Sequence, residues 1–204
     1  AGSMGASIRN LVTANGELFF LANDGIYGEE LWKSDGTSSG TILVKDIRSG
    51  INGSFPEKLT DVNGVLFFTA TDGVNGGELW KSDGTTSGTT LIKDIKPGSG
   101  SPNLDNFSNV NGTLYFTAND GVHGVEMWKS DGTNAGTVMV KDILAGIGSG
   151  IGAPPNFTDV NGIVYFSAGG IANDVELWKS NGTSDGTVLV KDIRPGSTPS
   201  YPNY

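Results

Sequence analysis

ELWKSDGT, residues 30–37, decides the fold because the chain repeats it. The stretch recurs unchanged at residues 78–85, as EMWKSDGT at 126–133 and as ELWKSNGT at 176–183. The tryptophans of the four copies are 48, 48 and 50 residues apart, and a period of roughly 40–50 residues is typical of propellers and related arrays. The repeat therefore predicts a modular fold built from four similar units.

Within one unit, the sequence alternates short apolar runs with turn residues. In the second unit, the runs at 58–62, 65–70, 78–82 and 89–95 predict four strands, because aromatic and β-branched residues favour strands. Asn63-Gly64 and the later Asp-Gly pairs supply the positive φ angles of tight turns. No segment has a sustained apolar period of 3.6 residues, so we expect few helices.

Four-stranded antiparallel units repeated at this period predict an all-β fold, a β-propeller with four blades in the chain. A blade packed between neighbours buries both faces, and we expect Leu31 and Trp32 to fill the gaps on opposite faces. The repeated tryptophans are accordingly interpreted as packing between blades rather than as ligand-stacking groups. These are Trp32, Trp80, Trp128 and Trp178.

The boundaries of the units follow from the repeat. Residues 1–6 are interpreted as a tail that includes a cloning remnant, and residues 7–204 as a single propeller domain. The four repeats cover about 7–50, 51–98, 99–148 and 149–196, and a linker tail follows. A native targeting segment could have been removed upstream of such a remnant.

Composition excludes several classes of protein. A formal net charge of −9 argues against nucleic-acid binding, which needs a basic face. No apolar run reaches the roughly 20 residues of a membrane-spanning helix, so we expect no membrane span. The chain has no cysteine, which excludes disulfides and thiolate chemistry.

The motif resembles a bacterial family described by its own consensus, the ELWxxDGT repeat. Glu30-Leu31-Trp32 and Asp35-Gly36-Thr37 carry the resemblance, and GTILVKDI at residues 40–47 and its three copies extend it. The resemblance covers nearly everything from Ser7 onward. It implies a propeller fold and a secreted or cell-surface location, and it implies no defined enzymatic activity.

The four repeats leave two assemblies open. A ring of four blades could close within one chain, or two chains could complete a ring of eight blades as a homodimer. An open half-ring would expose apolar faces on its first and last blades, which soluble monomers avoid. That argument favours the homodimer.

Aspartates gather on one predicted face of the blades and suggest a cation site. Calcium takes several oxygen ligands from carboxylates and carbonyls, and glycine-rich loops present carbonyls freely. The hypothesis pairs a loop aspartate with the aspartate that ends the fourth strand of the same blade. The alternative is that an aspartate before glycine only forms its own turn. The candidate residues are Asp24, Asp46, Asp72, Asp94, Asp120 and Asp142.

The repeated glutamates do not predict catalysis. A pair of catalytic carboxyl groups needs two different environments, whereas Glu30 and its three equivalents occupy the same position in every blade. The sequence therefore favours a non-enzymatic binding scaffold, with calcium, a carbohydrate or a protein as the ligand. Two alternatives stay open: a structural spacer of an adhesin, and a hydrolase that uses the unrepeated residues Tyr27, Glu57, Lys58 and His123.

Overall fold

Each repeat contains a hairpin whose turn is an Asn-Gly pair. In the computed structural model, which describes residues 5–152, 155–169, 175–193 and 195, both residues of these turns have positive φ. Asn63 has a φ of 54° and Gly64 a φ of 83°, and Gly64 N donates a hydrogen bond to Asp61 Oδ1. These angles match the right-handed twist of the flanking strands, so the pair fixes the register of the first two strands of a blade.

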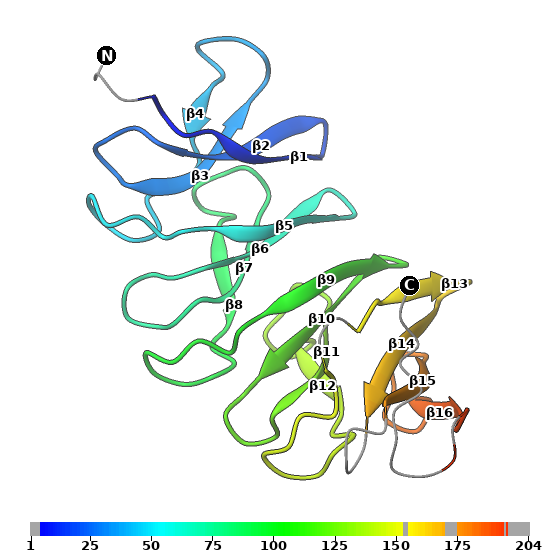
Figure 1. The fold of residues 1–204 in the computed structure, drawn as a ribbon. Helices are drawn as coiled ribbons and strands as arrows, with labels where there is room; N and C mark the ends of the chain where they lie inside the picture. The colour runs from blue at the N-terminus through cyan, green and yellow to red at the C-terminus, as the bar shows by residue number, and fades with distance from the viewer. Residues whose placement is uncertain (1–4, 153–154, 170–174, 194, 196–204) are drawn as a thin grey trace. The chain divides into compact units, whose positions relative to one another are not determined.

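The chain divides into two units, Ala1–Ser101 and Pro102–Tyr204, and each holds two four-stranded antiparallel sheets (Figure 1). The strands of the first unit are β1 (Arg9–Ala14), β2 (Glu17–Asn23), β3 (Glu29–Ser34), β4 (Ile42–Leu43), β5 (Glu57–Val62), β6 (Val65–Ala70), β7 (Glu78–Ser82) and β8 (Thr90–Lys93). Those of the second are β9 (Asp105–Val110), β10 (Thr113–Asn119), β11 (Val125–Ser130), β12 (Val138–Lys141), β13 (Thr158–Val160), β14 (Ile163–Gly169), β15 (Val175–Ser180) and β16 (Val188–Lys191).

The sheets confirm the predicted all-β fold of four-stranded blades. In every sheet the strands lie side by side in chain order, and each sheet comes from one sequence repeat. No helix occurs among the described residues, so none of them forms a helix able to span a membrane. The fourth strand of the second blade, predicted at 89–95, is shorter in the structure and spans Thr90–Lys93. Ile95 lies outside the strand, and its amide binds Glu78 Oε2 instead.

In the first unit, the two sheets pack face to face. Leu31 and Val44 of the first blade share one buried cluster with Leu66, Phe68 and Trp80 of the second. Leu31, Leu66 and Phe68 are fully buried. Burying such a side chain stabilises a fold by about 1.5–3 kcal/mol, so this interface stabilises the unit.

The second unit repeats this packing with different side chains. Met127 and Val140 of the third blade cluster with Val164, Phe166 and Ala168 of the fourth. Phe166 also meets Phe157 edge to face, with the ring centroids 5.8 Å apart. Because Met127 stands where the other blades have leucine, the interface tolerates a change of apolar shape at that position.

The first strand of each blade carries a positive-φ residue at an equivalent position beside or within its start. Asn10, Lys58, Asn106 and Asn156 have φ between 51° and 57°, and the register of β1, β5 and β9 shifts beside the first three. Such β-bulges bend a strand and turn side chains in new directions. Asparagine tolerates this conformation better than lysine does, so Lys58 is strained relative to its three equivalents.

Replacing Lys58 by asparagine is expected to stabilise the protein by about 0.5–1 kcal/mol, because it removes this backbone strain. Urea unfolding measures the change. Asn10→Lys, the reverse exchange at the equivalent position, should destabilise the protein by a similar amount. If both variants shift the unfolding midpoint in the same direction, backbone strain is not the cause.

Candidate functional site

The glutamate of each repeated motif is buried and binds the connection that leaves the same blade. Glu30, Glu78 and Glu126 are fully buried, and Glu176 is 2% exposed. Ile95 N donates to Glu78 Oε2 at 2.8 Å, and Ile193 N donates to Glu176 Oε2 at 3.0 Å. A buried amide without a partner would cost about 1–3 kcal/mol, so each carboxyl group holds its connection in place.

The third blade shows the most complete arrangement. Glu126 Oε2 accepts a hydrogen bond from Ile143 N at 3.2 Å, and Oε1 accepts one from Gly150 N at 2.7 Å. A side chain on Gly150 would collide with this carboxyl group, because a methyl there would lie 2.5 Å from Glu126 Oε1. Glycine is therefore required for the close approach. In the first blade, Ser54 Oγ takes the corresponding place and donates to Glu30 Oε2.

Burial controls the ionisation of these groups. Loss of solvent raises the pKa of Glu30, of Glu78 and of Glu126 to about 7, although hydrogen bonds from backbone amides lower it in part. The aspartate that follows the fourth strand of the same blade adds to the rise in each case. Three equivalent carboxyl groups therefore titrate together near neutral pH.

The aspartates after the fourth strands lie next to these glutamates. The Oδ1 atoms of Asp46, Asp94 and Asp142 are buried and accept no hydrogen bond. The other oxygen of Asp46 lies 3.4 Å from Gly50 N, and that of Asp142 lies 3.4 Å from Gly146 N. A buried carboxylate oxygen without a donor is a costly arrangement that a cation or a proton would relieve.

The loop aspartates form turns. Asp24 Oδ1 accepts hydrogen bonds from the amides of Ile26 and Tyr27, at 2.8 and 2.9 Å. Asp72 does the same for Val74 and Asn75, both at 2.8 Å. Burial alone would raise the pKa of Asp72, but these hydrogen bonds lower it overall. Asp24 and Asp72 thus form the turns of their own loops, as the alternative interpretation expects.

The described residues contain no group of three or more acidic or histidine side chains that could hold a metal ion. The carboxylates of one blade would therefore need backbone carbonyls to complete a calcium shell. Calcium binding by Asp24, Asp46, Asp72, Asp94, Asp120 and Asp142 stays a prediction.

The tryptophans lie at or near the buried faces of the sheets. Trp80 is 6% exposed and belongs to the core cluster of the first unit, and Trp128 is 7% exposed. Trp178 is half-buried and packs against the cluster of the second unit, while Trp32 is half-buried on the first blade. Two of the four indole rings are thus too buried to stack on a sugar.

The residues of the hydrolase hypothesis come from three separate segments, two in the first unit and one in the second. Tyr27 lies in the loop between β2 and β3, whereas Glu57 and Lys58 are neighbours on β5. His123 lies in the loop between β10 and β11, and its Nδ1 is 2.7 Å from Asp120 Oδ2. This hydrogen bond raises the pKa of His123. His123 and Asp120 thus belong to one turn, and Glu57 and Lys58 to another site.

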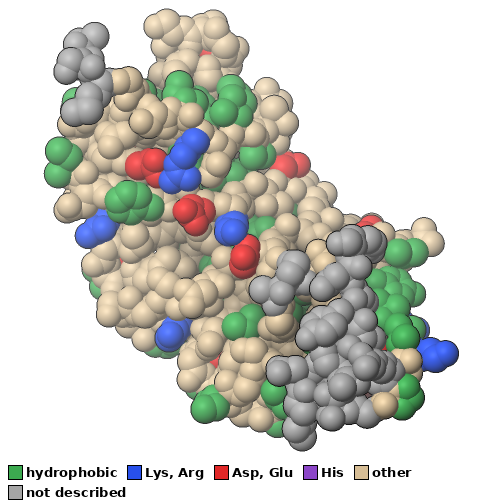
Figure 2. Space-filling view, viewed as in Figure 1, with side chains coloured by type: hydrophobic (Ala, Val, Ile, Leu, Met, Phe, Trp, Pro, Cys, Tyr) green, Lys and Arg blue, Asp and Glu red, His purple; other side chains and the backbone are tan. Residues whose placement is uncertain are grey.

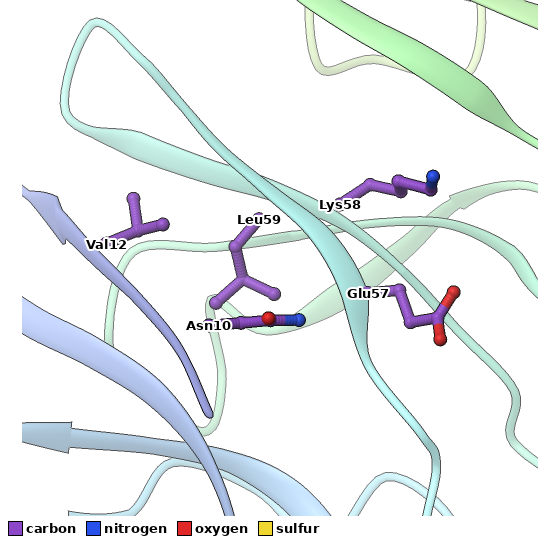
Figure 3. A pocket seen from close by; sticks show the side chains of 5 residues that line it. All are labelled: Asn10, Val12, Glu57, Lys58 and Leu59. Atoms are coloured by element: carbon purple, nitrogen blue, oxygen red, sulfur yellow. The ribbon is translucent and has the colours of Figure 1, made fainter. Parts of the chain in front are cut away.

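Glu57 and Lys58 line a pocket of about 470 Å³ in the first unit (Figure 3). Its other lining residues are Asn10, Val12 and Leu59, and Leu59 turns toward Asn10. The pocket lies between the bulged parts of β1 and β5, so the two positive-φ bulge residues, Asn10 and Lys58, border it. We call these five residues the inner-strand pocket.

Charged groups lie in and next to the inner-strand pocket. Arg9 Nε donates to Glu29 Oε2 at 3.0 Å, and the Arg9 guanidinium also interacts electrostatically with Glu57. Figure 2 shows acidic and basic side chains next to one another over the sheets of the first unit. A mixed polar and apolar surface of this kind suits a small polar ligand or a loop of another protein.

The sequence prediction did not include this pocket, although a signal for it existed. Asparagine stands at the same offset in three of the four repeats, as Asn10, Asn106 and Asn156, and asparagine is enriched at positive φ. The preceding residue differs in every blade: Arg9, Glu57, Asp105 and Pro155. A common backbone bulge thus presents different chemistry in each blade.

Four-stranded antiparallel sheets in chain order, packed face to face within each unit, are the blades of a β-propeller. No protein-family profile and no curated protein matches the sequence.

Solved structures share the fold at low sequence identity. Puromycin hydrolase, as the S511A mutant complexed with PGG, is 14% identical with a TM-score of 0.56, and the match covers 93% of this chain and 30% of that one. A puromycin-hydrolyzing peptidase of Mycobacterium tuberculosis is 10% identical with a TM-score of 0.51, covering 94% and 30%. One of two prolyl endopeptidases is 15% identical with a TM-score of 0.50, covering 85% and 24%. The chain thus spans less than a third of these proteins, and the likeness concerns the fold alone.

Proposed function

We propose that the chain is a non-enzymatic binding scaffold from a secreted or cell-surface bacterial protein of the ELWxxDGT repeat type. One observation carries the proposal: the repeated Glu and Trp of the motif lie inside the blades, whereas several unrepeated polar residues are exposed. Glu78 and Trp80 are buried, whereas Tyr27 is 38% exposed and Glu57 and Lys58 are exposed on β5. A constant frame that presents variable side chains is the usual arrangement of a binding scaffold.

The inner-strand pocket is the place where we expect the ligand. It offers a carboxylate, an ammonium group and an amide within one hollow, together with two aliphatic side chains. Carbohydrates and polar peptide loops both match this combination of hydrogen-bonding and apolar groups. Because Trp80 and Trp128 are buried, a sugar would contact pocket residues or Tyr27 rather than these rings.

Calorimetric titration with calcium and with a panel of oligosaccharides and acidic and basic peptides tests the proposal. We expect one of these ligands to bind, and Glu57→Gln with Lys58→Ala to weaken its binding at least about tenfold, or about 1.4 kcal/mol. Val74→Ala is the matched control, because Val74 is exposed on a loop that does not line the pocket. Absence of binding across the panel would favour the structural-spacer alternative.

The hydrolase alternative predicts turnover of ester, peptide or glycoside substrates. We expect none above the rate of a heat-denatured sample. Turnover that is lost on Glu57→Gln or His123→Ala, with the fold intact by circular dichroism, would contradict the non-enzymatic assignment.

A further inference from the structure

Each sheet has two faces that serve different partners. We call the face that carries Trp32 or its equivalents the leading face, and the face that carries Leu31 or its equivalents the trailing face. In the first unit, Leu31 and Val44 on the trailing face of the first blade pack on Trp80 and Phe68, on the leading face of the second. The second unit packs the trailing face of the third blade on the leading face of the fourth in the same way.

The trailing face of the last blade, β13–β16, is exposed. Val160 is 47% exposed, whereas its equivalent Val110 is 3% exposed inside the second unit. Val190 is 43% exposed, whereas Val140 is 5% exposed. A hollow of about 240 Å³ opens here and is lined in part by Val160, Tyr165 and Leu177. These residues occupy the positions with which the first and third blades bind their neighbours.

The leading face of the first blade, β1–β4, is exposed in the complementary way. Leu11 is 61% exposed, whereas its equivalents Leu59 and Phe157 pack against the cores of their units. Thr41 is exposed, whereas Thr89 and Thr187 are fully buried. The first blade thus lacks the neighbour that covers this face in the second and fourth blades.

The turn glycines also show that the first blade lacks the neighbour that the second and fourth blades have. A methyl placed on Gly84 would lie 2.8 Å from Glu17 Oε2 of the preceding blade, and one on Gly182 would meet the Tyr115 hydroxyl. The equivalent Gly36 has no atom within 4 Å of such a methyl. A methyl placed on Gly64 would likewise lie 3.6 Å from the Cβ of Asn15 in the preceding blade. One placed on the equivalent Gly16 would have no atom within 4 Å.

A polar contact completes the interface inside each unit. Lys45 Nζ donates to Thr89 O at 2.7 Å, and Lys141 Nζ donates to Thr187 O at 2.8 Å. In both pairs a lysine that follows or ends the fourth strand reaches the carbonyl of the next blade's turn. Lys191 and Thr41 are the corresponding groups at the ends of the array, and both are exposed.

We propose that a second copy of this chain docks head to tail, with its β1–β4 leading face on the β13–β16 trailing face of the first. The occupant follows from continuity with the interfaces inside the units, because the two exposed faces carry the two halves of that interface. Lys191 of one copy then donates to Thr41 O of the other, and Gly36 lies against Tyr165. Such a contact is heterologous, with different surfaces on the two copies.

Light scattering of the purified chain tests the proposal. We expect a mass of at least twice the 21.2 kDa of one chain. Leu11→Glu and Val190→Glu should each reduce it to that of one chain, because each buries a carboxylate in an apolar contact. Val74→Glu is the control and should leave the assembly intact, since Val74 is 75% exposed on a loop. Both test residues are exposed within the chain, so circular dichroism should show each variant folded.

Mixing the two variants distinguishes head-to-tail docking from any symmetric contact. Leu11→Glu retains a normal trailing face, and Val190→Glu retains a normal leading face. Their equimolar mixture should therefore form a complex of two chains, although each alone is monomeric. A wild-type mass of 21.2 kDa at high protein concentration would overturn the proposal. So would a mixture that stays monomeric.

Discussion

Replacing Glu126 by alanine is expected to lower the free energy of unfolding by about 2–5 kcal/mol at about pH 5. The substitution removes the acceptor for the amides of Ile143 and Gly150. It also leaves a void at the base of the connection to the fourth blade. Urea unfolding followed by circular dichroism measures the loss.

Two variants control this result. Glu126→Gln retains one of the two acceptor oxygens and the same side-chain length, so it should lose clearly less than the alanine variant. Glu57→Ala removes an exposed carboxylate and should change stability by no more than about 0.5 kcal/mol. If the alanine and glutamine variants at position 126 were equally stable, hydrogen bonding to the connection would not be the role of this glutamate.

Stability is expected to fall as the pH rises from about 5 to about 8. Burial raises the pKa of Glu30, of Glu78 and of Glu126 from 4.5 to about 7, so the folded chain favours their protonated forms. The stability that this preference supplies is complete below the unfolded pKa and is lost as the pH rises through about 7. Each group contributes at most about 3 kcal/mol. We expect the melting temperature to fall by at least roughly 5 °C over this range.

Aspartates act in the opposite direction at lower pH. Hydrogen bonds from Thr37 lower the pKa of Asp35, and those from Thr85 lower the pKa of Asp83, so their contribution is lost only as the pH falls through these lowered values. Among the carboxyl groups, the glutamates therefore dominate above about pH 5. Glu78→Gln should flatten the decline, because an amide does not ionise. A melting temperature that is constant from about pH 5 to about pH 8 would contradict the raised pKa values.

Local sequence patterns were sufficient to predict the blades. Asn63-Gly64 sets a two-residue turn, and the apolar run VLFFTA at 65–70, which follows it directly, is typical of a strand with both faces packed. Both signals act between residues close in the chain. Because these turn and strand signals recur in each of the four repeats, the all-β fold and the four strands of each blade could be predicted from the sequence.

The candidate site depended on contacts between residues distant in the chain. Glu126 meets Gly150 across 24 residues, and no local pattern predicts that a glutamate between apolar residues will bind backbone amides. Lys58 adopts a positive φ that its residue type disfavours, because the same backbone conformation occurs at the equivalent position of every blade whatever residue stands there. The aspartates were easier to interpret, since Asp24 and Asp72 bind amides two and three residues away.

Titration of the glutamate side chains by carbon NMR tests the central claim most directly, namely that the repeated glutamate is a buried group rather than a solvated one. Samples labelled at the glutamate carboxyl carbon, with Glu30→Gln, Glu78→Gln and Glu126→Gln used for assignment, give each pKa separately. We predict that these three carboxyl groups titrate near 7. Titration of all three near 4.5, the value of a solvated glutamate, would contradict the account.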